Sequence, residues 1–380
     1  MRVVLFTGSL GTGGAERQFA LLGRLLADRG CSVIFVTMEA RGCDPNYLAM
    51  LEGVRREVLF ERVQAGPMRM AQLMNGWRKL LVHLQDIQAD VVYSCLEWPN
   101  WLAARSASSM KTAPLVVAGI RNSGERMSWK RRLPVRLLAR RGRADAVIAN
   151  SRAGLEEARS AGIRSGVERV VFNGIDTKRF TPDPDAAREW KRRNGIPQRS
   201  KCIGHVGRLS PMKDHPTLLR AFGKVARKHR DFHLVCIGDG PIEIRERYER
   251  MVRDIGVQSQ VHWRPHEEDM PSAYSACDVL VMSSRDGEGF PNSVGEAMAC
   301  ETPCVVTRVG EAPEIVGDEG SVVEVGDVDA LAHAMSELVE KPDLGRIARD
   351  RIQANYGTTS MVDMTLDVFE KARAARGDAG

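Results

Sequence analysis

The sequence predicts an α/β protein with two doubly wound parallel sheets, one in each half of the chain. Short apolar runs alternate with helical patterns almost throughout, which is typical of parallel βαβ units. The scheme restarts after a stretch rich in turn residues near 173–187, and 380 residues suit two domains of roughly 100–200 residues each. Hydrophobic residues make up 43% of the chain, and no apolar run approaches the roughly 20 residues of a membrane span, so a soluble protein is expected.

The first half is expected to begin with a buried strand, RVVLFTG, which enters a glycine-rich loop instead of the cleavage site of a signal peptide. A helix is expected over 14–30, because apolar residues recur on one face and Gly30 can cap its end. That face comprises Ala15, Phe19, Leu22 and Leu26. Further strands are predicted in CSVIFVTM, DVVYSCL, APLVVAGI and ADAVIANS.

The second half repeats the scheme with expected strands in KCIGHVGR, DFHLVCIGDG, SQVHWRP, CDVLVMSS, TPCVVTRV and GSVVEVG. We therefore expect an N-terminal domain over 1–180, a C-terminal domain over 181–355, and a helix over 356–380 that packs back towards the N-terminal domain. The eight cysteines are scattered without a CxxC pair, so reduced thiols and a cytoplasmic location are expected. The net charge of +6 is modest for this length.

A first glycine loop, TGSLGTGGAERQ (7–18), follows a strand and opens a helix, so its backbone amides can approach a phosphate or a sugar. Glu16 stands where a dinucleotide fingerprint requires its third glycine, and Gly13 is followed by Gly14 instead of the lysine of a P-loop. A tight turn with no ligand is the alternative interpretation.

A second loop, GHVGRLSPMKDHPTLLRAF (204–222), places Arg208 and Lys213 between a strand and the next helix. Two cations at the carboxyl end of a parallel sheet suit a diphosphate, whose charge is spread over several oxygens. Two solvated surface cations are the alternative.

The stretch RDGEGFPNSVGEAMACETP (285–303) sets two acids beside the start of a predicted helix, for which Asn292 is the expected N-cap. Free amides there suit a phosphate, whereas a carboxylate placed against a phosphate costs binding energy. An ionised carboxylate accepts hydrogen bonds from two neighbouring hydroxyls, so Glu288 and Glu296 suit sugar diols on either side of the phosphates. The stretch therefore predicts a nucleotide-sugar site.

The Glu, seven residues, Glu arrangement in EGFPNSVGE resembles the defining motif of the family four retaining glycosyltransferases with the GT-B fold. Similar landmarks occur in the family's order: GGAERQ, NGID followed by RF, VGRL followed by a lysine, GDGP (238–241) and GEAPEIV (310–316). Together they span nearly the whole chain. The resemblance implies two Rossmann-like domains facing across a cleft, with the donor bound mostly by the C-terminal domain and the acceptor by the N-terminal one.

The resemblance also assigns roles. Arg208 and Lys213 would hold the diphosphate and stabilise the leaving group, so neither a metal nor a cofactor is expected. Glu288 would bind the transferred sugar and Glu296 the ribose. The remaining donor-binding positions are Gly13 and Gly14 from the other domain, Arg264 near the base, and Phe290, Pro291, Asn292, Ser293 and Val294. The implied reaction moves a sugar from a nucleotide-diphosphate-sugar, expected to be UDP-linked, to a glycan or lipid-linked acceptor in cell-surface polysaccharide, lipopolysaccharide or glycolipid assembly.

The sequence departs from the family pattern in three places. Many members carry a histidine after the fourth N-domain strand, whereas this chain has Arg121, Asn122 and Ser123 there. His83 stands in an ordinary helical pattern, so no histidine is assigned to catalysis. Glu301 replaces the usual glycine after EAMAC, and GEAPE replaces a double glycine, so the donor sugar stays open.

A basic stretch over 126–143 interleaves cations with apolar residues at helical spacing, which is typical of a surface that lies on an anionic membrane. Its cations are Arg126, Lys130, Arg131, Arg132, Arg136, Arg140, Arg141 and Arg143, and its apolar residues are Trp129, Leu133, Leu137 and Leu138. A solvated helix whose leucines pack on the sheet is the alternative interpretation. Nucleic-acid binding is a minor alternative, because aromatic residues make up only 6% of the chain and no nucleic-acid-binding module is visible.

Two rival functions remain. A catalytically silent nucleotide-sugar-binding protein would keep the fold but lose the leaving-group cations, and both are present here. Nucleotide-sugar epimerases share the two-domain architecture but lack the Glu, seven residues, Glu motif. Fold alone does not separate these functions.

Overall fold

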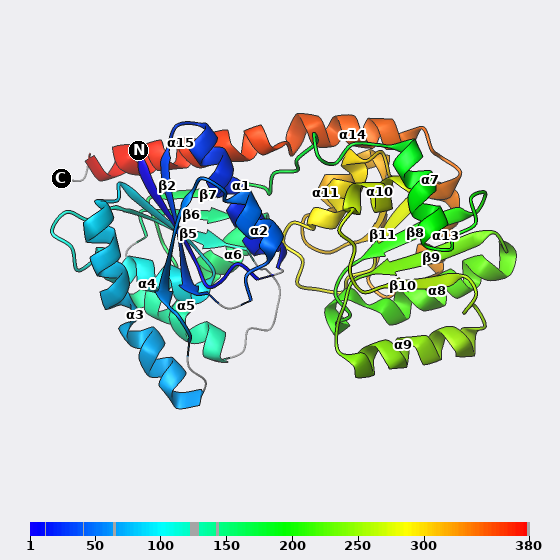
Figure 1. Ribbon diagram of the computed structural model, residues 1–380, viewed down its shortest axis with the longest axis horizontal. Helices are drawn as coiled ribbons and strands as arrows, with labels where there is room; N and C mark the ends of the chain where they lie inside the picture. The colour runs from blue at the N-terminus through cyan, green and yellow to red at the C-terminus, as the bar shows by residue number, and fades with distance from the viewer. Residues whose placement is uncertain (12, 41, 64–65, 122–128, 142–143, 378–380) are drawn as a thin grey trace. The chain divides into compact units, whose positions relative to one another are not determined.

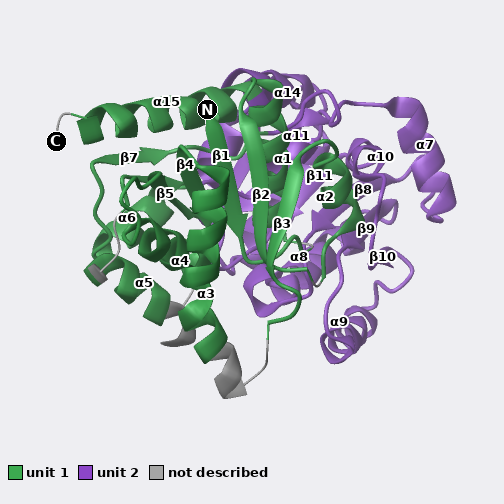
Figure 2. Ribbon diagram, turned by 60° about the vertical axis from the view of Figure 1, so that its left-hand side comes forward, with its two compact units in different colours: residues 1–174, 359–380 green, residues 175–358 purple. Residues whose placement is uncertain are grey.

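The structure is a computed structural model that describes residues 1–380 except 12, 41, 64–65, 122–128, 142–143 and 378–380. It divides into two compact units, which Figure 2 colours separately. Unit 1 comprises Met1–Gly174 and Thr359–Gly380, and unit 2 comprises Ile175–Thr358. Each unit contains its own parallel sheet, so the prediction of two doubly wound α/β sheets is confirmed.

The sheet of unit 1 has seven parallel strands in the order β3-β2-β1-β4-β5-β6-β7. Figure 1 labels β2, β5, β6 and β7 of this sheet. Their bounds are β1 Arg2–Thr7, β2 Ser32–Glu39, β3 Arg55–Phe60, β4 Val91–Cys95, β5 Leu115–Ile120, β6 Ala146–Ala149 and β7 Val167–Val170. The order reverses between β1 and β4, the topological switch point at which such sheets bind ligands. The loop with Gly13 follows β1 at this point.

Two strands of unit 1, β3 and β7, are missing from the sequence prediction. Both lie at the edges of the sheet. Their sequences, RREVLF and VERV, carry charged residues, and most of their side chains are at least partly exposed. Because an edge strand is less buried than an inner one, it lacks the continuous apolar run from which the inner strands are predicted.

Helices cover both faces of the unit 1 sheet. One face packs against α3 Gly66–Ile87, α4 Glu97–Ala107, α5 Trp129–Arg141 and α6 Arg152–Ser160. The other face packs against α1 Gly14–Asp28, α2 Pro45–Met50 and α15 Thr358–Gly377. The predicted apolar face of α1 is buried at Phe19, Leu22 and Leu26, and Gly30 follows the helix with a left-handed φ of 81°.

Unit 2 contains six parallel strands in the order β10-β9-β8-β11-β12-β13, all of them expected from the sequence. Their bounds are β8 Lys201–Val206, β9 Phe232–Ile237, β10 Val261–Arg264, β11 Val279–Met282, β12 Cys304–Thr307 and β13 Ser321–Val323. The order reverses between β8 and β11, so a second switch point lies there.

The helices of unit 2 also lie on both sides of the sheet. Residues of α8 His215–Lys228, α9 Ile242–Ile255 and α13 Val328–Val339 form one core cluster, and residues of α7 Pro184–Arg193 and α10 Met270–Ser275 form another. The remaining elements are η1 Pro211–Lys213, α11 Asn292–Ala299, α12 Ala312–Val316, η2 Gly317–Glu319 and α14 Leu344–Asn355.

Two further expectations concern thiols and membrane spans. All eight cysteines lie within the described ranges and are free thiols. In the part of the chain that the structure describes, no helix is long and apolar enough to cross a membrane.

Candidate active site

The predicted donor residues of unit 2 lie at the carboxyl edge of its sheet, at the switch point between β8 and β11. The loop after β8 carries Arg208 and Lys213, and the loop after β11 carries Glu288. The two strands are parallel neighbours, so the fold brings both loops to the same place. A backbone hydrogen bond of 2.8 Å from Arg285 N to Met212 O joins them directly.

Two glycines let backbone segments approach closely at this edge. Gly238 has a φ of 144°, and a Cβ added there would lie 2.1 Å from the carbonyl oxygen of Gly207. Gly310 has a φ of 56°, and its added Cβ would lie 2.1 Å from the carbonyl oxygen of Glu288. The loops after β9 and β12 are therefore packed backbone to backbone against the loops that carry the candidate residues.

Lys213 and Glu288 form a largely buried ion pair. The Nζ of Lys213 lies 2.5 Å from Oε1 of Glu288, and the two side chains are 13% and 10% exposed. The hydroxyl of Ser284 donates to the same oxygen at 2.6 Å, while Ser283 donates to the backbone oxygen of Lys213 at 2.8 Å. Sequence reasoning missed both serines, since a serine in a loop carries no signal of its own.

This pair can bind an anion and a hydroxyl side by side. An ammonium group has three donors, so Lys213 can hold a phosphate oxygen while it still contacts the carboxylate. The ion pair also offsets part of the cost of burying the charge of Glu288. Arg208 is exposed one residue after Gly207, on the same loop as Lys213.

Glu296 lies on α11 and has a different set of contacts. It is 4% exposed, and its Oε2 accepts a hydrogen bond of 3.0 Å from the hydroxyl of Tyr274. The prediction that Asn292 caps this helix is wrong: the residue before the first turn is Pro291, and Asn292 is the first helical residue. Proline lacks an N–H, and the residue before a helix needs no amide donor of its own, so Pro291 is tolerated there.

The other predicted donor positions surround α11 and the end of β10. Phe290 is buried with its ring 5.6 Å from that of Tyr356, and Ser293 and Val294 lie in the first turn of α11. The side chain of Arg264 reaches the end of α7, where it donates a hydrogen bond of 2.7 Å to the backbone oxygen of Asn194. The backbone oxygen of Arg264 accepts from Gly238 N at 2.8 Å.

In unit 1, the glycine loop ends at the start of α1. Gly13 is the residue before the helix, and Gly14 is its first residue. A carboxylate oxygen of Glu16 lies 2.0 Å from the position that a Cβ on Gly13 would take. A negative charge therefore already occupies this helix N-terminus, which disfavours a phosphate there and leaves sugar hydroxyls as the better match.

The positions relevant to the missing histidine are also in unit 1. Arg121, which follows β5, is buried and donates to Asn173 Oδ1 at 2.7 Å and to the Tyr93 hydroxyl at 3.1 Å. Asn122 and Ser123 lie outside the described residues. His83 of α3 lies 2.6 Å from Glu57 of β3, which fits the prediction of an ordinary helix residue.

Two histidines of unit 2 lie buried behind the Lys213 loop, and sequence reasoning did not single them out. The ring of His215 lies 4.6 Å from that of His205 and is stacked 5.1 Å from Tyr248. Burial, with the positive charge of Lys213 as a smaller cause, lowers the pKa of His205 to about 4. Burial likewise lowers the pKa of His215 to about 2, so both rings are neutral near pH 7.

The basic stretch is described only in part. Residues 122–128, which include Arg126, lie outside the described residues, and so does Arg143. The structure also leaves out the side chains of Trp129, Lys130, Arg131, Arg132 and Arg141. Of the described residues, Arg136 and Arg140 are exposed, while Leu137 and Leu138 pack against the unit 1 core. The leucines thus fit the packed-helix alternative, and membrane docking stays a prediction.

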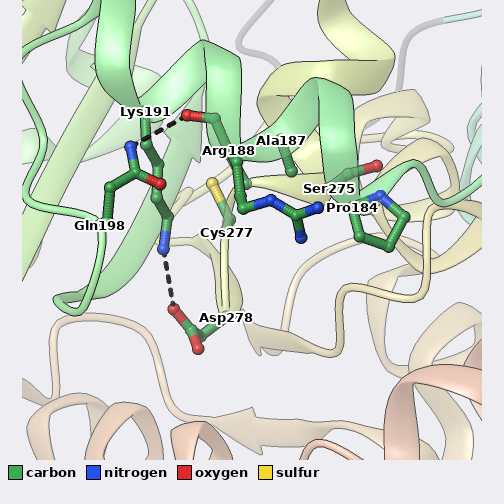
Figure 3. A pocket seen from close by; sticks show the side chains of 9 residues that line it. Pro184, Ala187, Arg188, Lys191, Gln198, Ser275, Cys277 and Asp278 are labelled. Atoms are coloured by element: carbon green, nitrogen blue, oxygen red, sulfur yellow. Dashed lines mark hydrogen bonds and ion pairs between the residues drawn. The ribbon is translucent and has the colours of Figure 1, made fainter.

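A separate pocket of about 220 Å³ opens between α7 and the start of β11 (Figure 3). In it Lys191 Nζ lies 3.8 Å from Asp278 Oδ2, and Gln198 donates to Arg188 O at 3.0 Å. Asp278 precedes β11, so this pocket lies at the amino edge of the sheet, opposite the candidate site. In the described ranges, no three His, Cys, Asp or Glu side chains are grouped so that they could hold a metal ion.

Two family models match this chain. Residues 12–179 match the model described as glycosyltransferase family 4, and residues 200–341 match the model described as glycosyl transferases group 1. The matched segments contain Gly13 and Gly14 in one case and Arg208 to Glu296 in the other. Both matches support the prediction of a glycosyltransferase.

Curated relatives are similar over part of their length. The GDP-mannose-dependent alpha-(1-6)-phosphatidylinositol monomannoside mannosyltransferase of Mycolicibacterium smegmatis is 37% identical over 180 residues, which cover 44% of this chain and 46% of that protein. The D-inositol 3-phosphate glycosyltransferase of Corynebacterium jeikeium is 38% identical over 192 residues, 47% of this chain and 45% of that protein. The chain thus spans about half the length of the curated relatives it matches.

Solved structures share the fold over nearly the whole chain. HepE of Anabaena, crystallised in complex with UDP, has a TM-score of 0.83 at 20% identity and covers 97% of this chain and 100% of that one. Sucrose-phosphate synthase of Thermosynechococcus elongatus has a TM-score of 0.79 at 22% identity, with coverage of 99% and 100%. The predicted GT-B architecture of two Rossmann-like parallel-sheet domains is therefore confirmed.

Proposed function

We propose that this chain, whose two halves match glycosyltransferase family models, is a retaining glycosyltransferase that uses a nucleotide-diphosphate-sugar. The observation that carries the proposal is the buried Lys213–Glu288 pair, with 2.5 Å between Nζ and Oε1 at the switch point of unit 2. It sets a phosphate-binding cation directly beside a hydroxyl-binding acid. A nucleotide-sugar presents these two groups next to each other, where the diphosphate joins the sugar.

In the proposed reaction, unit 2 binds the donor and unit 1 binds the acceptor. Lys213 and Arg208 neutralise the charge that develops on the departing nucleoside diphosphate. Glu288 accepts hydrogen bonds from hydroxyls of the transferred sugar, and Glu296 from the ribose diol. Gly13 and Gly14 contact the sugar from unit 1, and the transferred sugar keeps its anomeric configuration.

The proposed nucleotide is guanosine diphosphate, with mannose as the sugar. The relatives do not support the UDP-linked donor expected from the sequence, because the mannosyltransferases of Mycolicibacterium smegmatis and Corynebacterium glutamicum are named as GDP-mannose-dependent. Their names also give a phosphatidylinositol mannoside as acceptor, and others give inositol 3-phosphate. A phosphorylated inositol, free or in a lipid, is therefore the proposed acceptor class, in glycolipid assembly.

A thermal-shift comparison of GDP-mannose, GDP, UDP-glucose and UDP tests the donor. A ligand that binds the folded state at 100 times its Kd adds roughly 2.7 kcal/mol of stability, so GDP-mannose and GDP should raise the Tm. Stabilisation by the uridine compounds alone would show that the base is wrong, and no shift with any of the four would refute the site.

Turnover separates the enzyme from a catalytically silent binding protein. Incubation with GDP-mannose and phosphatidylinositol in detergent should release GDP and form a mannosylated lipid whose anomer, by NMR, matches that of the donor. Donor binding without release of GDP, over a panel of inositol acceptors, would favour the silent alternative. An inverted anomer would contradict the retaining mechanism.

A further inference from the structure

The hydroxyl of Tyr274 points at Glu296 from a neighbouring helix. Its oxygen lies 3.0 Å from Oε2 of the carboxylate, and both side chains are almost fully buried, at 1% and 4% exposure. Tyr274 stands in PSAYSACDVL, which carries no sequence signal of a ligand site. The contact therefore becomes visible only in the folded chain.

The backbone around Tyr274 is fixed on several sides. Its carbonyl oxygen accepts a hydrogen bond of 2.7 Å from Thr302 Oγ1, and its ring lies 6.1 Å from that of Phe180. Asp269 caps the N-terminus of α10 by accepting from Ser272 N at 3.3 Å. A tyrosine held in this way presents its hydroxyl at one place, so the oxygen that it contacts is held there too.

Both acids accept hydrogen bonds from fixed donors. Glu288 accepts from Lys213 and from the Ser284 hydroxyl on one oxygen, and Glu296 accepts from the Tyr274 hydroxyl. Burial favours the protonated form of a carboxyl, and a hydrogen bond donated to the carboxylate favours the ionised form. A carboxyl must be ionised, and its plane must be fixed, to accept from both hydroxyls of a diol.

We propose that Tyr274 is a positioning residue for the donor ribose, because it orients Glu296 and keeps it ionised. The inference rests on the proposed function, in which Glu296 accepts the ribose diol. Tyr274 touches no substrate atom in this scheme, so its removal changes how tightly the nucleoside is held and leaves the chemical step alone.

The test uses Tyr274→Phe, which keeps the ring and removes the hydroxyl, and GDP and 2′-deoxy-GDP as probes in calorimetry. We expect the wild type to bind GDP about tenfold more tightly than 2′-deoxy-GDP, a difference of about 1.4 kcal/mol. Tyr274→Phe should bind GDP about tenfold more weakly and discriminate between the two nucleotides less than twofold. Its donor KM should rise while kcat stays unchanged.

Tyr248→Phe is the matched control. Tyr248 is also a buried tyrosine of unit 2, 4% exposed, and its ring stacks on that of His215. This variant should bind GDP and discriminate as the wild type does. Full discrimination in Tyr274→Phe, or equal loss in the control, overturns the proposal while the proposed function stands.

A third variant keeps the test valid if Tyr274→Phe is poorly stable. Glu296→Gln retains the shape of the acid but not its charge, and it should lose the preference for GDP over 2′-deoxy-GDP. Adding Tyr274→Phe to it should then weaken GDP binding by less than twofold, because the two residues act through one contact. Additive losses overturn the proposal. A wild type that binds both nucleotides equally refutes the ribose assignment itself, and with it this part of the proposed function.

A pH series gives an independent readout. If Tyr274 keeps Glu296 ionised, GDP binding by Tyr274→Phe should weaken between pH 8 and pH 6 by at least threefold more than in the wild type. Parallel pH profiles would mean that the hydroxyl does not hold the acid in its ionised form, and would overturn that half of the proposal.

Discussion

Nζ of Lys213 and Oε1 of Glu288 lie 2.5 Å apart, although the two residues are proposed to bind different parts of one donor. The contact explains how an acid can stand next to the proposed phosphate site without repelling the ligand. The lysine neutralises the carboxylate locally, and Ser284 holds its oxygen in place. The pair therefore presents a fixed acceptor and a fixed donor before any ligand arrives, which is the preorganisation that catalysis requires.

The first prediction concerns the leaving-group cations. Lys213→Ala or Arg208→Ala should lower kcat about a hundredfold with a smaller change in donor KM, because losing one preorganised charge costs on the order of 3 kcal/mol in the barrier. Steady-state kinetics with GDP-mannose measure the effect. Lys224→Ala, which removes an exposed lysine of α8 paired with Asp329, is the control and should keep full activity. Wild-type turnover in both site variants contradicts the assignment, as does a strict need for a divalent metal after EDTA treatment.

The second prediction concerns Gly310, whose φ of 56° and close approach to Glu288 leave no room for a side chain. Gly310→Ala should reduce the free energy of unfolding by about 1–3 kcal/mol and also weaken GDP binding, because the backbone that carries Glu288 must shift. Chemical denaturation and calorimetry measure the two effects.

Gly256→Ala is the matched control for this prediction. Gly256 has a φ of 83°, but an added Cβ would meet nothing within 4 Å. The control should lose about 1 kcal/mol of stability through backbone strain alone and bind GDP normally. Weakened GDP binding in Gly256→Ala, or normal GDP binding in Gly310→Ala, would show that the close backbone approach of Gly310 to Glu288 does not affect donor binding.

At the scale of elements, the sequence predicts inner strands well and edges poorly. Apolar runs predict all six strands of unit 2. They do not predict β3 and β7 of unit 1, because charged side chains interrupt the apolar pattern of these two strands. The acids and cations of the candidate site stand in recognisable sequence patterns, so their place at the carboxyl edge of the sheet is predictable. Tyr274 and Ser284 are not, since their roles depend on contacts between α10, α11 and the loop after β11 that no local spacing encodes.

The third prediction belongs to α5. Leu137 and Leu138 pack on the unit 1 core and are therefore not available to a membrane, so the prediction concerns the cations of the stretch. If they dock on an anionic surface, each contributes about 1 kcal/mol, and binding to phosphatidylserine vesicles should be strong at low salt and weak at high salt. Replacing Arg131, Arg132, Arg140 and Arg141 with glutamine should abolish cosedimentation and leave GDP binding unchanged.

The control variant removes the same number of positive charges from another helix. Glutamine at Arg245, Arg247, Arg250 and Arg253 of α9 removes four positive charges from unit 2 and should leave vesicle binding intact. Equal losses in both variants would indicate a response to net charge alone. If the wild type does not bind the vesicles at low salt, α5 is an ordinary packed helix.

At the scale of the whole molecule, the buried histidines of unit 2 make stability depend on pH. The pKa of His205 is lowered to about 4 and that of His215 to about 2, so the unfolded chain binds more protons than the folded one as pH falls below about 6.5. The stability that these neutral rings allow is present above pH 6.5 and is lost as pH falls from there towards 4 for His205 and towards 2 for His215. Each histidine contributes a slope of up to about 1.4 kcal/mol per pH unit.

The fourth prediction follows from that slope. His215→Phe keeps an aromatic ring against Tyr248 and takes up no proton, so the free energy of unfolding should fall less steeply between pH 7 and pH 5 than in the wild type. Urea titrations at both pH values, followed by tryptophan fluorescence, measure it. His333→Phe is the control, because His333 is an exposed residue of α13 and its replacement should leave the slope unchanged. An unaltered slope in His215→Phe would show that another group controls the acid sensitivity.

The chain crosses between the units twice, after Gly174 and after Thr358, and unit 1 is therefore built from both ends of the sequence. Met361, Val368 and Phe369 of α15 complete the core cluster that holds Tyr93, with the Phe369 ring 6.0 Å from the tyrosine. On the ribosome, the first 174 residues emerge long before these side chains, whereas unit 2 is contiguous and emerges whole. Unit 2 can thus fold during synthesis, whereas the core cluster of unit 1 that holds Tyr93 stays incomplete until α15 has left the exit tunnel.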